Sequence, residues 1–306
     1  MPYLFAHFKE KITPDGEAVC FGKSRDGFNW ERVNNGNPVL TSSLGERGCR
    51  DIEIVRLHTG GFAIITTDLC VANRYDENLN LDWKNINSHG SKSLCIWKTP
   101  DLVNFSEQKL QYFGRDDFGC MWAPEVFFDE ENEEYLIHWG STIKEDNYTH
   151  MSIYCSVTKD FESFSDPKLF FTKENEILDS HITKIDDTYH LFYKNSSNPP
   201  MNMHATSHNL YGPYTHDNAF EEYMNKEVQN PGSYEGPTTY TLPDGRWCLM
   251  LDFFGCEKEK MGYVPFVSNA SGDSNFTRMT EGFSFPYGFK HGKVIKITEE
   301  EYCRLV

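Results

Sequence analysis

The sequence Ser233-Tyr234-Glu235-Gly236-Pro237-Thr238-Thr239-Tyr240 places a carboxylate directly before a Gly-Pro turn and a run of β-forming residues. Glycine and proline mark a tight turn, whereas threonine and tyrosine favour a strand. Glu235 is therefore expected at the mouth of a strand, where its side chain can face a pocket. Four similar strand starts occur along the chain: Arg50-Asp51 before Ile52–Val55, Trp122-Ala123-Pro124-Glu125 before Val126–Phe128, Leu178-Asp179-Ser180-His181 before Ile182–Ile185, and His291-Gly292 before Val294–Ile297.

A second signal repeats between these strand starts. It is a polar turn that ends in an aromatic residue, as in Ser24–Trp30, Thr99–Phe105 and Thr158–Phe164. Each turn follows a strand-like run, and a further apolar run lies between it and the preceding strand start. Every repeat therefore contains several strands and an ionisable group at the start of its first strand. Repeats of this kind predict the blades of a β-propeller around a central channel.

The order of the repeats predicts an all-β fold, namely a single five-bladed β-propeller domain over residues 1–306. No strand that begins with an ionisable group precedes the N-terminal run Tyr3–Phe8. The run after His291 is such a strand and has no further strands after it. We expect these two strands to share the last blade and close the ring, which removes two exposed sheet edges. The loops Val71–Gly90 and Asn195–Asn202 are expected at the rim. One short helix is expected around residues 298–302.

Composition narrows the class of function. The formal net charge is −17, which argues against nucleic acids and anionic membranes as partners, because both are bound through basic patches. No signal peptide or membrane-spanning run is apparent, so a cytoplasmic location is expected. The nine cysteines show no metal-ligand spacing, and those within apolar runs are expected to be buried free thiols (Cys20, Cys95, Cys155 and Cys248). His204 and His208 are expected at the surface.

The ionisable groups at the strand starts suggest the chemistry. In a propeller, Asp51, Glu125, Asp179, Glu235 and His291 should converge on one end of the channel. Burial and mutual repulsion there would raise the pKa of at least one carboxyl group. A neutral carboxylic acid near an ionised carboxylate is the pair that glycosidic bond cleavage requires.

The motifs Arg50-Asp51, Trp122-Ala123-Pro124-Glu125, Leu178-Asp179, Glu235-Gly236-Pro237 and His291-Gly292 resemble those of glycoside hydrolase family 43, in order and spacing. The resemblance implies a five-bladed propeller that cleaves arabinose- and xylose-containing plant glycans with inversion. It also departs from the family pattern twice: Ile52 follows Asp51 where proline is usual, and Glu125 stands where aspartate is usual.

The same resemblance implies roles for individual residues. Asp51 would be the general base, Glu235 the general acid, and Asp179 the residue that tunes the pKa of the acid. We expect Trp122, Glu125, His181 and His291 to contact substrate. No cofactor is required, although the position of His291 near the channel axis allows an indirect contact with a structural Ca²⁺ ion in the channel.

These inferences lead to an inverting exo-glycosidase acting on plant-type oligosaccharides, either an α-L-arabinofuranosidase or a β-xylosidase. A β-galactosidase-type exo-glycosidase and a non-catalytic glycan-binding propeller are alternatives, and the oligomeric state is left open. A glycoside phosphorylase is a third, but it needs cations near the base, and the motifs offer only Arg50 and His181. Lys194, Trp139 and Asp68 are further candidates for substrate contact.

Overall fold

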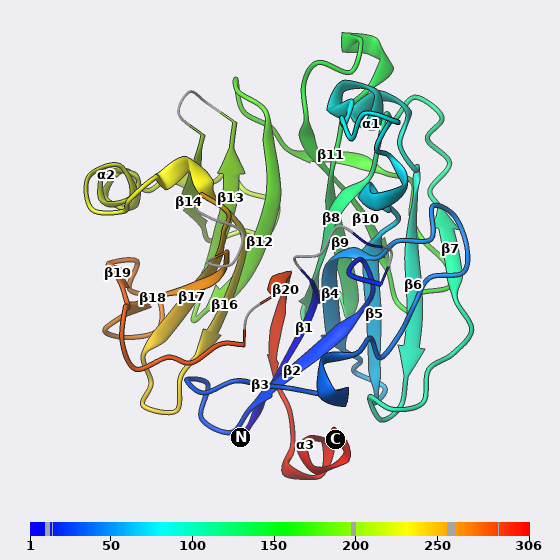
Figure 1. The fold of residues 1–306 in the computed structure, drawn as a ribbon. Coiled ribbons are helices and arrows are strands. Elements are labelled where there is room, and N and C mark those ends of the chain that lie inside the picture. The colour runs from blue at the N-terminus through cyan, green and yellow to red at the C-terminus, as the bar shows by residue number, and fades with distance from the viewer. Residues whose placement is uncertain (10–12, 14, 197–199, 256–260, 287) are drawn as a thin grey trace.

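The structure is a computed structural model that describes residues 1–306 except 10–12, 14, 197–199, 256–260 and 287. Strands dominate it, which confirms the prediction of an all-β fold (Figure 1). In the described part of the chain they form one eight-stranded sheet and three four-stranded sheets. The eight-stranded sheet consists of two antiparallel runs of four strands, which pair in parallel where Gly292 lies opposite Ile52. The strands therefore group into five four-stranded units.

All five units are built alike, with a long inner strand, two further long or medium strands and a short outer strand. From the inner to the outer strand, unit 1 contains β20 (Phe289–Lys296), β1 (Tyr3–Lys9), β2 (Cys20–Ser24) and β3 (Glu31–Arg32), and unit 2 contains β4 (Arg50–Arg56), β5 (Phe62–Thr67), β6 (Ser93–Thr99) and β7 (Lys109–Tyr112). Unit 3 contains β8 (Trp122–Asp129), β9 (Glu134–Ser141), β10 (Ser152–Thr158) and β11 (Lys168–Phe171), and unit 4 contains β12 (Ile177–Ile185), β13 (Thr188–Asn195), β14 (Met201–Ser207) and β15 (Thr215–His216). Unit 5 contains β16 (Tyr234–Thr241), β17 (Trp247–Phe253), β18 (Gly262–Ser268) and β19 (Thr277–Arg278).

The inner strands contact one another in a closed circuit. β20 contacts β4, β4 contacts β8, β8 contacts β12, β12 contacts β16, and β16 contacts β20. β1 pairs antiparallel with β20, with Tyr3 opposite Lys296 and Lys9 opposite Phe289. This pairing confirms that the N-terminal strand and the strand after His291 share one unit.

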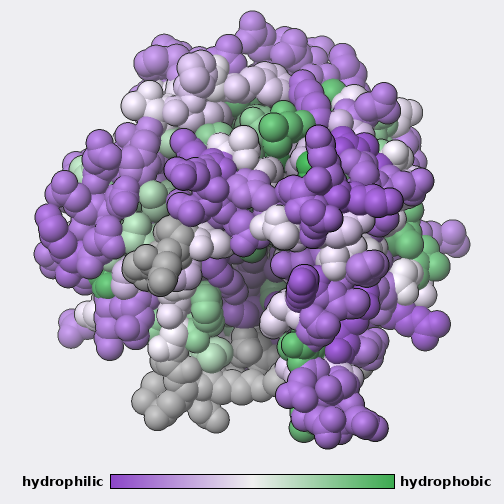
Figure 2. All heavy atoms as spheres, turned by 90° about the horizontal axis from the view of Figure 1, so that it is seen from above, coloured by the Kyte–Doolittle hydropathy of each residue, from purple (hydrophilic) through white to green (hydrophobic). Residues whose placement is uncertain are grey.

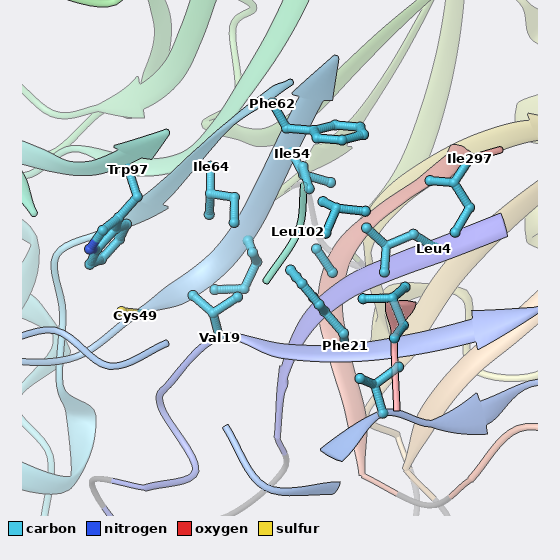
Figure 3. Packing of buried hydrophobic residues seen from close by; sticks show 14 of the residues in the cluster. Leu4, Val19, Phe21, Cys49, Ile54, Phe62, Ile64, Trp97, Leu102 and Ile297 are labelled. Carbon is cyan, nitrogen blue, oxygen red and sulfur yellow. The ribbon is translucent and has the colours of Figure 1, made fainter. Parts of the chain in front are cut away.

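Five clusters of buried hydrophobic side chains fill the spaces between neighbouring units. Figure 3 shows the cluster between units 1 and 2, where Leu4 and Phe21 lie near Ile54 and Phe62. Successive residues of a strand point to opposite faces, so each unit contributes to two clusters. One such pair lies in each unit, namely Leu4 and Phe5, Ile64 and Ile65, Leu136 and Ile137, Leu191 and Phe192, and Leu249 and Met250. Burial on both faces explains the continuous apolar runs in the sequence.

The repeated polar turns also have one structure. Their aspartate side chains accept hydrogen bonds from backbone N–H groups two and three residues later. This bonding holds the turn, and the closing aromatic residue packs back against the clusters between units. The three aspartates and their aromatic partners are Asp26 with Trp30, Asp101 with Phe105, and Asp160 with Phe164.

The helices are short and lie outside the sheets. They are α1 (Trp83–His89), α2 (Asn218–Lys226), α3 (Glu299–Arg304) and the 3₁₀ turns η1 (Asn34–Gly36), η2 (Val71–Asn73), η3 (Lys144–Asp146) and η4 (Pro231–Ser233). A capping box formed by Thr298 and Glu301 begins α3, the helix expected from the sequence. No helix in the described ranges is long and apolar enough to cross a membrane.

The predicted rim loop at residues 71–90 contains η2 and α1, whereas residues 197–199 of the other predicted rim loop lie outside the described residues. α1 is at the opposite end of the molecule from α3 and the two termini (Figure 1).

Two predictions about single side chains have different outcomes. The four cysteines expected in strands are buried free thiols, as predicted. His204 is buried rather than at the surface, because it lies on β14 and its ring stacks on Phe192. The side chain of Asp217 supplies the hydrogen-bond partner that this buried histidine needs.

Candidate active site

A β-bulge interrupts each inner strand near its start. The registers shift between Arg50 and Glu53, Trp122 and Glu125, Leu178 and His181, and Glu235 and Thr238, and in β20 the shift leaves His291 without a partner residue opposite. The first bulge residues of β4, β8, β12 and β16 have positive φ, namely Asp51 (51°), Ala123 (49°), Asp179 (53°) and Gly236 (56°). Bulges re-aim side chains and are common beside active sites.

The bulges of the five inner strands surround one pocket of about 220 Å³. It is lined by Arg50, Asp51, Leu69, Trp83, Trp122, Leu178, Asp179, Glu235 and His291. The structure therefore brings together Asp51, Asp179, Glu235, His291 and Trp122 of the predicted site. Seen from the end that carries α1, the surface is hollowed near its centre and mainly hydrophilic around the hollow (Figure 2).

Asp51 is held as a carboxylate. Its Oδ1 lies 3.1 Å from Nδ1 of His291, and its Oδ2 accepts a hydrogen bond from Thr67. Burial opposes ionisation, but the charge of His291 and the neighbouring Arg50 outweigh it and lower the pKa of Asp51 to about 2. Burial lowers the pKa of His291, but Asp51, with smaller effects of Asp179 and Glu235, outweighs it and raises this pKa to about 9. At neutral pH the two groups form an ion pair.

Asp179, unlike Asp51, has a raised pKa. Burial, together with the nearby carboxylates Glu235 and Asp51, raises its pKa to about 6, although His291 and Lys194 act in the opposite direction. It is thus the carboxyl group of the pocket that most readily holds a proton near neutral pH.

Glu235 lies between two lysines. Nζ of Lys194 donates a hydrogen bond of 2.7 Å to Oε2, and Nζ of Lys290 lies 3.6 Å from Oε1. Burial alone would raise the pKa of Glu235, but the two ammonium groups outweigh it and lower the pKa to about 2. Without substrate, the residue predicted as the general acid is therefore ionised.

Two predicted substrate contacts lie elsewhere. Glu125 and His181 do not line the pocket, because each lies two residues beyond the first bulge residue of its strand, deeper in the molecule. His181 Nδ1 lies 2.9 Å from Oε2 of Glu125. The ammonium of Lys293 lies 2.5 Å from the same oxygen and 3.2 Å from Oε2 of Glu53. The strand starts therefore occupy equivalent places in the five units, whereas the ionisable side chains within them occupy different positions relative to the bulge.

These contacts do not fit the Ca²⁺ ion that the sequence allowed in the channel. Ca²⁺ takes six to eight oxygen ligands, whereas here an ammonium group occupies the space between the two buried carboxylates. Within the part of the chain that the structure describes, no group of three His, Cys, Asp or Glu side chains could hold a metal ion.

A larger groove of about 530 Å³ adjoins the pocket and shares Arg50, Trp83 and Glu235 with it. The ring of Trp83 on α1 meets that of Trp122 edge to face, with 6.1 Å between the ring centres. Glu17 pairs with Arg50 and accepts hydrogen bonds from backbone N–H groups of the rim loop. Glu17 thereby ties the rim to β4.

Sequence reasoning did not select Glu17, Trp83 or Lys290. Lys290 alone had a signal, because it directly precedes His291 in the last strand-start motif. Of the further candidates, Lys194 contacts Glu235. Trp139 and Asp68 do not line the pocket, since Trp139 lies in a hydrophobic cluster and Asp68 binds the backbone of Glu46.

Comparison with known proteins supplies the context for this geometry. A family described as "Probable glycosyl hydrolase domain", related to family 43, matches residues 1–303. An α-L-arabinofuranosidase of Bifidobacterium longum subsp. longum is 25% identical over 196 residues, which are 58% of this chain and 18% of the relative. The chain thus spans less than a fifth of that relative's length.

Solved structures share the fold. An endo-arabinase from Bacteroides thetaiotaomicron matches with a TM-score of 0.59 at 14% identity, over 88% of this chain and 90% of its own. A mutant of a family 43 protein from Bacillus licheniformis has a TM-score of 0.60 at 14% identity, over 97% of this chain and 56% of its own. An exo-β-1,3-galactanase from Phanerochaete chrysosporium has a TM-score of 0.51 at 16% identity, over 81% and 51%.

Proposed function

Because this chain belongs to the glycosyl hydrolase family related to family 43, we propose that it is an inverting, exo-acting glycosidase of plant-type oligosaccharides. The observation that carries the proposal is the meeting of Asp51, Asp179 and Glu235 in one pocket with His291. The proposal includes a five-bladed propeller, in which each four-stranded unit is a blade. The closed circuit of contacts among the inner strands supports that arrangement.

The proposed mechanism divides the work between two carboxyl groups. Asp51, ionised beside His291, accepts a proton from the attacking water. Glu235 gives a proton to the glycosidic oxygen as the bond to the leaving group breaks. Asp179 disfavours a second negative charge nearby and so favours the protonated form of Glu235. Water attacks opposite the leaving group, so the product has inverted anomeric configuration.

Exo-action is supported by the size of the pocket. Its volume of about 220 Å³ is below the roughly 300–1,000 Å³ of pockets for drug-sized ligands. A single sugar ring fits this space better than a chain of several. Trp83 and Trp122 give it an aromatic wall, and sugars bind such walls through their apolar faces.

For the sugar itself we propose α-L-arabinofuranose or β-D-xylose, with β-D-galactose as the alternative. The named activity of the Bifidobacterium relative supports arabinose, and that of the Phanerochaete structure supports galactose. A non-catalytic glycan-binding propeller would use the same pocket without turnover.

The test is hydrolysis of a panel of aryl glycosides (α-L-arabinofuranoside, β-D-xyloside and β-D-galactoside), with the first product followed by proton NMR. We expect turnover of one member with an inverted first product. Asp51→Asn should abolish turnover and Glu235→Gln should lower it, whereas Glu107→Gln, an exposed substitution, should leave it unchanged. A retained configuration would contradict inversion. Lack of turnover on every member, with binding of the glycans, would support the non-catalytic alternative.

A further inference from the structure

We propose that the groove beside Glu235 binds a leaving group that carries a carboxylate, as an acidic sugar does, and that Lys194 and Lys290 bind this carboxylate. The inference rests on the proposed function, because it places the leaving group on the side of the general acid. It goes beyond that function by naming the chemical class of the leaving group.

The first observation is the charge of the groove. Among the described residues, four cationic side chains and two carboxylates, Glu17 and Glu235, line its volume of about 530 Å³; the cations are Lys9, Arg50, Lys194 and Lys290. The chain as a whole carries a formal net charge of −17, so a predominantly basic groove runs against its composition. Concave sites lined by one sign of charge concentrate ligands of the other sign.

The second observation is that the two lysines beside Glu235 are built into the protein. The side chains of Lys194 and Lys290 are 14% and 7% exposed. Nζ of Lys290 lies 2.9 Å from Oδ2 of Asp252, which is fully buried. That oxygen also accepts a hydrogen bond from the backbone N–H of His291. These contacts fix Lys290 at the junction of the pocket and the groove.

The third observation concerns the balance of charge during the reaction. While Glu235 is ionised, Glu235 and Asp252 balance the charges of Lys194 and Lys290. A general acid must hold a proton, and protonation of Glu235 removes one of the negative charges that these two buried ammonium groups face. A carboxylate on the leaving group restores the balance and draws Lys194 away from Glu235. Once Lys194 has moved away, less positive charge opposes the effect of burial on Glu235, so the pKa of Glu235 rises.

Other charged groups face Glu235 as well. His291 on β20 lowers the pKa of Glu235, as the two lysines do. Asp179 on β12 and Asp252 on β17 interact with Glu235 as like charges. Arg50 on β4 is a further cation within electrostatic range. The cations outweigh the two carboxylates in the absence of substrate, and a bound anion shifts this balance towards protonation.

The position of the lysines also distinguishes a carboxylate on the leaving group from the attacking phosphate of a phosphorylase. An attacking phosphate would lie beside the base, Asp51, whose ion-pair partner is His291. Lys194 and Lys290 instead contact the acid. An anion bound by them therefore lies on the leaving-group side, where a substituent of the substrate belongs.

The experiment compares two substrates that differ only in charge. The sugar identified by the glycoside panel is linked to glucuronic acid or to its neutral methyl ester, and kcat/KM is measured for both. We expect the wild type to prefer the acid about tenfold or more, since hydrogen bonds between charged groups are worth at least that factor. Lys194→Gln should lose the preference. Lys226→Gln, on the exposed face of α2, should keep it. Equal values of kcat/KM for the two substrates in the wild type would overturn the inference and leave the glycosidase proposal intact.

A binding measurement makes the test independent of turnover and of variants. Trp83 lines the groove, so tryptophan fluorescence of the wild type reports ligands there. Free glucuronate should bind more tightly than its methyl ester, and 0.5 M salt should weaken the difference. Equal affinities would overturn the inference even if no glycoside is hydrolysed. A sulfated sugar that binds and reacts in preference to the carboxylate, or turnover that requires inorganic phosphate, would also overturn it.

Discussion

Nδ1 of His291 lies 3.1 Å from Oδ1 of Asp51, and each residue belongs to the β-bulge of its strand, β20 and β4, which are parallel neighbours. The last inner strand of the sequence thus supplies the cation that holds the proposed base ionised. This contact couples the pocket to the only parallel pairing of strands in the described residues.

The pair predicts how stability depends on pH. The pKa of His291 is raised to about 9 from its usual value near 6.5, so its contribution is complete below pH 6.5 and is lost as pH rises through 9. Asp51 contributes above pH 4 and loses its contribution only near pH 2. We expect the wild type to lose roughly 1–3 kcal/mol relative to His291→Gln between pH 6.5 and 9.5. Urea unfolding at several pH values measures this, and parallel curves for the two proteins would contradict it.

The acid assignment predicts a dependence on the leaving group. Glu235→Gln should lower kcat/KM by about 10²–10⁴-fold for a sugar leaving group, which needs a proton to depart. The loss should be much smaller for a dinitrophenyl glycoside, because that leaving group departs unprotonated. Asp51→Asn should impair both substrates alike. If Asp179→Asn instead showed the selective loss, Asp179 would be the acid.

The buried ion pairs of Lys293 predict a stability effect without any metal. Lys293→Met removes the ammonium group that contacts the buried side chains of Glu125 and Glu53, and breaking a buried ion pair costs about 3–5 kcal/mol. Lys296→Met, an exposed change on the same strand, should have little effect. Thermal unfolding with Ca²⁺ and with a chelator should give the same Tm. A higher Tm with Ca²⁺ would contradict the internal ion pair.

We predict that Gly236 cannot be replaced without loss of activity, and a substitution at Gly245 serves as the control. It has φ of +56°, and a Cβ atom there would lie 2.7 Å from Cδ2 of His291. Gly236→Ala should therefore displace the imidazole and lower activity as well as stability. Gly245 has φ of +87° with nothing within 4 Å of such a Cβ, so Gly245→Ala should cost only about 1–2 kcal/mol of backbone strain. Similar activities of the two variants would contradict the role given to Gly236.

Much of the fold could be predicted from sequence because it repeats. Polar turns with a fixed aspartate and a closing aromatic residue recur along the chain, and local hydrogen bonds determine their structure. Asp51, Asp179 and Glu235 could be placed in one pocket for the same reason. Their strand starts are related by the repeat.

The rest depended on register and on tertiary contacts. Glu125 stands in an equivalent motif, but the bulge at Ala123 directs it into the channel towards Lys293. Glu125 directly follows Pro124, whereas Glu235 lies two residues before Pro237, so the two glutamates occupy different positions relative to their bulges. Glu17 and Trp83 reach the site from a loop and from α1, and their role emerges only once the chain has folded.

The pairing of β1 with β20 has a consequence for biosynthesis. β1 leaves the ribosome well before β20, which follows at residues 289–296, and the unit that they share is complete only when β20 has joined it. Contacts so distant along the chain form late in folding. Because β20 also carries Lys290 and His291, the pocket remains electrostatically incomplete until that strand joins. A chain without β20 would therefore have the carboxylates in place without Lys290 and His291, two of the cations that control their protons.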